Sequence, residues 1–145
     1  MRIFYGLMIA SLFLVGCEKA RLDQQVKELC AKDGGVKVYE TVTLSTDMYD
    51  RYARTNWILP DKSDAKPTDD YYIEIQRHYY KTGNPEMSRR QYRIIRRSDE
   101  KVLGESISYG RGGGDLPGPW HGSSYHCPSG ESLSIETKVF QRGSK

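Results

Sequence analysis

The chain has 145 residues, which suits one small domain with a hydrophobic core and leaves little for a second domain. Its formal charge of +3 is too small to indicate nucleic-acid binding through phosphate neutralisation. We therefore expect a single globular domain without a nucleic-acid partner.

An apolar segment follows the short basic start Met1–Arg2. It runs from Ile3 to Val15, about 13 residues, whereas a membrane-spanning helix needs about 20. This length is typical of the apolar core of a signal peptide, although an uncleaved short anchor or a buried helix is the alternative. The pattern predicts that residues 1–16 form an export signal and residues 17–145 form the mature domain.

The apolar run ends in Leu14-Val15-Gly16-Cys17. This segment resembles the lipobox of bacterial lipoproteins, which places a branched apolar residue first and a small residue before the cysteine. The resemblance implies a diacylglyceryl group on Cys17, cleavage before it by signal peptidase II, and acylation of the freed amine. Because more than one acyl chain holds a protein firmly to a bilayer, we expect stable membrane attachment. In lipoproteins of this kind, an Asp directly after the cysteine favours the inner membrane. Because this chain has Glu18 there, the resemblance implies an outer-membrane anchor and a periplasm-facing domain.

Two cysteines remain after Cys17. Lipidation of Cys17 explains the odd count, and exported proteins meet an oxidising compartment. We therefore predict a disulfide between Cys30 and Cys127, with two free buried thiols as the alternative.

Residues 18–33 are predicted to form a helix. Leu22, Val26, Leu29 and Cys30 follow a 3.6-residue period and share one face. Gly34-Gly35 is a suitable stop. Because the helix starts almost at the lipid, we expect the domain to lie close to the bilayer.

The rest of the chain reads mainly as strands separated by turns. We predict strands at 36–44, 71–81, 88–97, 102–109 and 132–141, a short helix at 46–54, and loops at 60–70 and 110–124. This order predicts an α+β fold, in which the N-terminal helix packs on an antiparallel sheet of about five strands. The order loosely resembles the curved sheets of cystatin-like and NTF2-like proteins, a resemblance that implies no function.

Glu40 falls on the apolar face of the first predicted strand. A buried carboxylate is costly unless it is paired or hydrogen-bonded. We expect Glu40 to pair with an arginine or to lie at an open end of the sheet, and a structural ion pair is the favoured reading.

Five arginines crowd the strand at 88–97. Alternation places Arg89, Arg93 and Arg97 on one face and Arg90 and Arg96 on the other. The first three are candidate ligands for anions such as lipid headgroups or lipopolysaccharide phosphate. The favoured alternative is a solvated face with cross-strand acidic partners. The carboxylates available nearby are Glu74, Asp99, Glu100 and Glu105.

Three other patterns carry weaker hypotheses. The paired tyrosines at 71–72 and 79–80 suit a binding surface, but aromatic residues are also ordinary in strands, which we prefer. The glycine-rich stretch 110–114 lacks the Lys-Ser/Thr ending of a phosphate-binding loop, so we expect a flexible loop. Within that loop, Trp120-His121 is a candidate partner contact.

No catalytic or metal-binding residue is predicted. His121 and His126 are five residues apart, which is not a standard ligand spacing. No nucleophile elbow occurs in the sequence. The expectation is therefore a protein without a metal, a cofactor or an enzymatic activity.

The stretch from Cys30 to Glu40 is similar to small Gram-negative lipoproteins of no assigned activity. We predict a non-enzymatic envelope protein that binds another envelope protein or a glycan through its sheet face or glycine-rich loop. One alternative is a carrier of a small ligand or lipid, with a cavity between helix and sheet. Another is an enzyme, favoured only if Glu40, an arginine and a histidine share one cleft.

Overall fold

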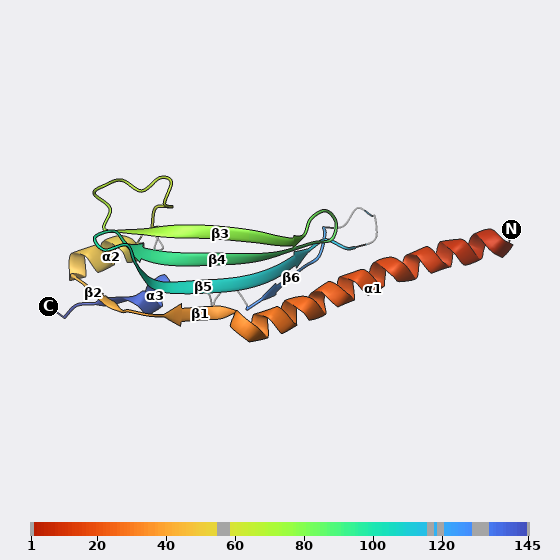
Figure 1. Cartoon of the computed structure of the whole chain (residues 1–145), viewed down its shortest axis with the longest axis horizontal. Coiled ribbons are helices and arrows are strands. Elements are labelled where there is room, and N and C mark those ends of the chain that lie inside the picture. The colour runs from red at the N-terminus through yellow and green to blue at the C-terminus, as the bar shows by residue number, and fades with distance from the viewer. Residues whose placement is uncertain (1, 55–58, 116–117, 119–120, 129–133, 145) are drawn as a thin grey trace.

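The computed structural model describes residues 2–54, 59–115, 118, 121–128 and 134–144. The elements in chain order are α1 (Arg2–Asp33), β1 (Gly35–Val38), β2 (Val42–Leu44), α2 (Thr46–Arg54), β3 (Tyr71–Lys81), β4 (Glu86–Arg96), β5 (Lys101–Gly112), β6 (Ser124–Cys127), α3 (Glu136–Val139) and β7 (Phe140–Arg142). Figure 1 shows the second half of α1 alongside β5 and β6, while α2, α3 and β2 gather at the opposite end of the sheet.

The main sheet is antiparallel, with the strand order β1-β5-β4-β3, and β6 also pairs with β5. β1 pairs with β5 over Gly104–Ile107, and β6 pairs with the same strand over Tyr109–Gly112. A second, two-stranded sheet joins β2 to β7 in parallel. The predicted α+β class, with an N-terminal helix and an antiparallel sheet of about five strands, is confirmed.

α1 packs on one face of the main sheet through its predicted apolar stripe. Leu22 and Val26 are buried against Met87 of β4 and Ile107 of β5. Val26 and Met87 have no exposed surface. The helix starts earlier than predicted, at Arg2.

The predicted disulfide between Cys30 and Cys127 is confirmed, with 5.9 Å between the two Cα atoms. It joins the last turn of α1 to the end of β6. Gly34 passes close to it, since a Cβ atom there would lie 2.7 Å from Cys30 Sγ. Cys17 is free and exposed on α1.

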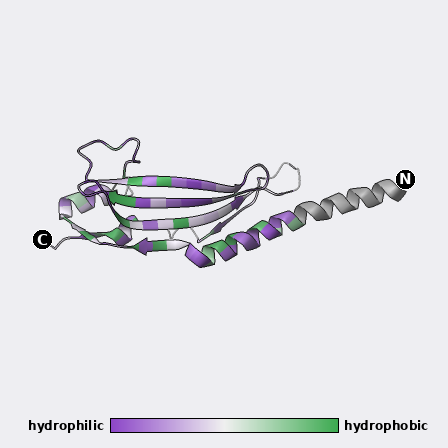
Figure 2. Cartoon of the chain, viewed as in Figure 1, coloured by the Kyte–Doolittle hydropathy of each residue, from purple (hydrophilic) through white to green (hydrophobic). Residues whose placement is uncertain are grey.

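A second apolar core lies on the opposite face of the sheet. Because side chains alternate between faces, Ile94 and Gly104 point away from the α1 side. α3 packs there closely enough that a Cβ atom on Gly104 would lie 3.0 Å from Val139 Cγ2. Phe140 is buried in the same cluster. Figure 2 shows the apolar residues of β3 and β4 gathered at this end, with polar residues prevailing toward the other end.

The predicted strand 36–44 is wrong as one unit, because it breaks between β1 and β2. The N–H groups of Tyr39 and Glu40 both donate to the carbonyl oxygen of Leu103, at 2.8 and 3.0 Å. Two donors on one acceptor cannot continue a regular ladder. The chain therefore leaves β5 and pairs next with β7.

The predicted last strand, 132–141, is also wrong over most of its length. Residues 136–139 are helical, and only β7 is extended. Ile135 and Val139 are buried, and a spacing of four places two residues on one face of either a helix or a strand. Leu133, expected to point inward, lies outside the described residues.

The predicted loop 110–124 is shorter than expected at both ends. Gly110 and Gly112 extend β5, and residues from Ser124 onward form β6. The two strands pair with each other, Gly110 opposite His126 and Gly112 opposite Ser124. Glycine content therefore did not indicate a loop at this position.

Candidate functional site

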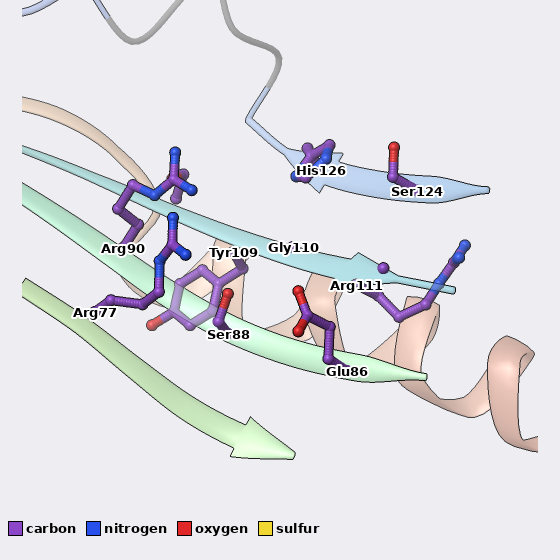
Figure 3. A pocket seen from close by; sticks show the side chains of 11 residues that line it. Arg77, Glu86, Ser88, Arg90, Tyr109, Gly110, Arg111, Ser124 and His126 are labelled. Atoms are coloured by element: carbon purple, nitrogen blue, oxygen red, sulfur yellow. The ribbon is translucent and has the colours of Figure 1, made fainter. Parts of the chain in front are cut away.

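A pocket of about 280 Å³ lies on the sheet face away from α1, at the end where β6 pairs with β5. Its position follows from register, because Ser88, Gly110 and His126 alternate with the residues that face the helix. Its lining residues come from β3, β4, β5 and β6 (Figure 3). Those facing the pocket are Arg77, Glu86, Ser88, Arg90, Ser108, Ser124 and His126.

Arg77 and Arg90 are directly opposite each other on β3 and β4. Figure 3 shows both guanidinium groups extending to the same side. Each donates to the hydroxyl of the tyrosine two residues later, Arg77 to Tyr79 at 3.1 Å and Arg90 to Tyr92 at 3.3 Å. Each guanidinium also lies about 6 Å from the centre of that ring. The tyrosines thus hold the two arginines without neutralising them.

Neither arginine has an ion-pair partner among the described residues. The other arginines of β4 are paired: Arg89 with Asp33 at 3.6 Å, Arg93 with Glu74, and Arg96 with Glu40 and Asp99. Two adjacent unpaired guanidinium groups repel each other at short range. A bound anion would relieve that repulsion and accept hydrogen bonds from both groups.

Polar side chains complete the pocket wall. Ser88, Ser108 and Ser124 carry hydroxyl groups that can donate to an anion. His126 lies directly over Gly110, since a Cβ atom on that glycine would be 2.5 Å from the imidazole Nδ1. Glu86 gives the wall one acidic group. The pocket therefore combines a cationic side with hydroxyl donors and one carboxylate.

Among the described residues, no hydrogen bond joins His126 to a serine or to Glu86, so no nucleophile is paired with a base. Within the same residues, no group of three or more His, Cys, Asp or Glu side chains gathers as metal ligands do.

The three arginines predicted to bind anions lie on the face of the sheet opposite the pocket. Arg93 pairs with Glu74, and Arg89 donates to Gln91 Oε1 at 3.0 Å as well as pairing with Asp33. Arg97 donates to the carbonyl oxygen of Asp69 at 2.7 Å and lies over the ring of Tyr72. Each of the three therefore has a partner within the protein, although the buried Nε of Arg93 makes no hydrogen bond to a described residue. Anion binding by Arg89, Arg93 and Arg97 stays a prediction.

Glu40 pairs with an arginine, which is one of the two arrangements expected from the sequence. Its carboxylate accepts from Arg96 and from Lys101, and these two bonds lower the pKa of Glu40. Glu40 does not line the pocket, which holds His126. The arrangement that favoured an enzyme, with Glu40, an arginine and a histidine in one cleft, is not formed in the described part of the chain.

The loop after β5 is tied to α1 by polar contacts that the sequence did not reveal. Arg111, 2% exposed, binds both carboxylate oxygens of Asp23, at 2.8 and 3.1 Å. Its remaining nitrogen donates to the carbonyls of Gly113 and Ser123. Asp115 accepts from Lys19 and Ser123, which lower its pKa to about 2. The loop is therefore fixed at its base.

The pocket residues were missed because some belong to separate predicted strands, whereas Ser124 and His126 belong to none of them. Alternation correctly placed Arg90 on the face opposite Arg89, but Arg77 was not among the predicted site residues. One signal was present: each of these two arginines is followed, two residues later on the same face, by a tyrosine. Of the four clustered tyrosines, Tyr79 and Tyr80 are exposed, whereas the pair at 71–72 is buried. His121 is exposed, and Trp120 lies outside the described residues.

Comparison of the chain with protein-family profiles, curated proteins and solved structures finds no match. Across the described residues, none of the helices has both the length and the hydropathy that a membrane crossing requires.

Proposed function

We propose that this chain is a lipid-anchored protein of the bacterial cell envelope and a non-enzymatic binding module for an envelope protein or glycan. The observation that carries the binding role is the pair Arg77 and Arg90, two guanidinium groups without carboxylate partners beside a pocket. An acidic group of the partner would occupy this pocket.

Membrane attachment rests on Cys17. Its sequence context is that of a lipobox, and its thiol is exposed while the other two cysteines are bonded to each other. The residues directly after it contact the folded domain, Glu18 through Lys81 at 3.2 Å and Lys19 through Asp115. A lipid on Cys17 would thus hold the domain directly at the bilayer, with the outer membrane as the proposed location.

We expect Cys17→Ser to abolish lipidation, because serine has no thiol to accept the diacylglyceryl group. In a Gram-negative host the unprocessed precursor should accumulate, and labelled palmitate should no longer enter the protein. Palmitate labelling and the size of the protein on gels measure both effects, with Cys30→Ser/Cys127→Ser as the control that keeps Cys17. Normal processing and labelling of Cys17→Ser would contradict the anchor.

The pocket is tested by photo-crosslinking in intact cells. A benzoyl-phenylalanine at Ser124, which lines the pocket, should give a discrete adduct, whereas the same group at exposed Gln25, on α1, should not. Arg77→Gln/Arg90→Gln should reduce the Ser124 adduct about tenfold or more, because it removes charge-assisted hydrogen bonds. Both arginines lack ion-pair partners in the described residues, so the fold should stay stable within about 0.5 kcal/mol. An adduct unaffected by the double substitution would refute the proposed site.

A further inference from the structure

Among the described residues, part of the outer edge of β3 has backbone groups without partners. The N–H of Ile73 donates to the carbonyl of Pro60 at 2.9 Å, and its C=O accepts from the N–H of Lys62 at 2.8 Å, so both point away from β4. Alternate residues of a strand direct these groups the same way. Ile75, Arg77 and Tyr79 therefore also direct theirs outward, and in the described residues no backbone group bonds to them there.

The side chains along this edge are accessible. Ile75 is 47% exposed and Tyr79 is 42% exposed, and Arg77 between them lines the pocket. All three lie on the pocket face, because they are two residues apart. An exposed edge with apolar side chains is a template for another strand unless proline, a bulge or inward charges block it. Between Ile75 and Tyr79 the pairing with β4 is regular.

We propose that the edge of β3 from Ile75 to Tyr79 binds an extended acidic segment of a partner protein as an added strand. A carboxylate of that segment lies opposite Arg77, at the pocket. Backbone hydrogen bonds supply affinity in this mode, and alternate side chains supply specificity. The inference rests on the proposed function, because the same arginine serves both, and it specifies the partner as a polypeptide.

Charge identifies the occupant. Arg77 and Arg90 present two positive groups that form no ion pair with a described carboxylate, so an acidic residue at this register gains a charge-assisted bond. A second copy of the chain fits poorly. In the antiparallel register that pairs all three outward-facing residues, Arg77 of one copy would lie opposite Arg77 of the other, and like charges directly opposite are destabilising.

The test uses the full lipidated protein in detergent micelles and a capped peptide, Thr-Val-Thr-Glu-Thr-Val-Thr. Its Val, Glu and Val side chains share one face and match Ile75, Arg77 and Tyr79. Ile75→Pro removes an outward N–H and leaves the bonds to β4 intact, which is where edge strands tolerate proline. Ile75→Ala is the matched control, since it shortens the side chain and keeps the N–H.

We expect Ile75→Pro to weaken peptide binding about tenfold, and Ile75→Ala to weaken it less than about threefold. A peptide with Lys in place of Glu should bind at least about tenfold more weakly than the parent. Hydrogen exchange on the unsubstituted protein should show the amides of Ile75, Arg77 and Tyr79 protected by the Glu peptide. This readout does not depend on the folding of any variant.

Unchanged exchange at these amides, or equal binding by Ile75→Pro and Ile75→Ala, would overturn the strand addition. If the Ser124 adduct still depends on Arg77 and Arg90 in that case, the pocket stands and only this inference fails. Concentration-dependent dimers abolished by Ile75→Pro would overturn it in favour of a second copy. Arginine-dependent binding to phosphatidylglycerol vesicles, without peptide binding, would overturn it in favour of a lipid headgroup.

Discussion

Loss of the Cys30–Cys127 disulfide should be among the most destabilising changes to this protein. The bond spans a sequence separation of 97. Treated as loop-closure entropy in the unfolded chain, a closed loop of roughly 100 residues corresponds to about 4.7 kcal/mol. We expect Cys30→Ser/Cys127→Ser to lower the free energy of unfolding by about 2–5 kcal/mol, measured by urea denaturation followed by circular dichroism.

The reduced form of the unsubstituted protein is the matched control. Dithiothreitol should shift its urea midpoint toward that of the double serine variant and leave the variant itself unchanged. If neither reduction nor substitution changes the urea midpoint, the disulfide does not stabilise the protein by restricting the conformational entropy of the unfolded chain. The slope of the transition should increase in the variant, because the unlinked unfolded chain exposes more surface.

The sequence predicted the parts of the fold that depend on local periodicity. The apolar residues of α1 at 22, 26 and 30 follow one helical stripe and are buried as that stripe requires. β3 has the predicted bounds, Tyr71–Lys81, because its flanking turns are strong signals. The prediction was wrong where the periodicity was ambiguous. Ile135 and Val139 fit a helix and a strand equally well, and the tertiary contacts with Gly104 decided for the helix.

The candidate site was less predictable, because it depends on pairing between strands. Arg77 and Arg90 are 13 positions apart, and only the β3–β4 register brings them side by side. The same holds for His126, whose place over Gly110 depends on β6 joining β5. Local patterns indicated which residues are charged and which face each occupies. They did not indicate which arginines would lack carboxylate partners.

Asp23→Ala should destabilise the protein by about 3–5 kcal/mol, because it leaves the guanidinium of Arg111 buried without its counter-charge. The side chain of Arg111 is only 3% exposed and that of Asp23 is 27% exposed, so water replaces the carboxylate only in part. Asp23→Asn should have a smaller effect, since the amide oxygen still accepts one hydrogen bond. Glu28→Ala, on an exposed position of the same helix, should change the unfolding free energy by less than about 0.5 kcal/mol.

The combined variant Asp23→Leu/Arg111→Met separates the cost of an unpaired charge from the value of the pair. Replacing both partners by apolar groups of similar size is often neutral, so the double variant should recover most of the stability that Asp23→Ala loses. The carbonyl of Gly113 would still lose the donor that Arg111 supplies, and that of Ser123 would keep only the N–H of Gly113, which leaves a residual loss of about 1–3 kcal/mol. If Asp23→Ala and the double variant are equally unstable, the loop contacts of Arg111 outweigh its ion pair. If neither is destabilised, the buried pair does not hold α1 against the sheet, and its attachment must come from its apolar stripe, the disulfide and its other ion pairs, such as Glu18 with Lys81 and Lys19 with Asp115.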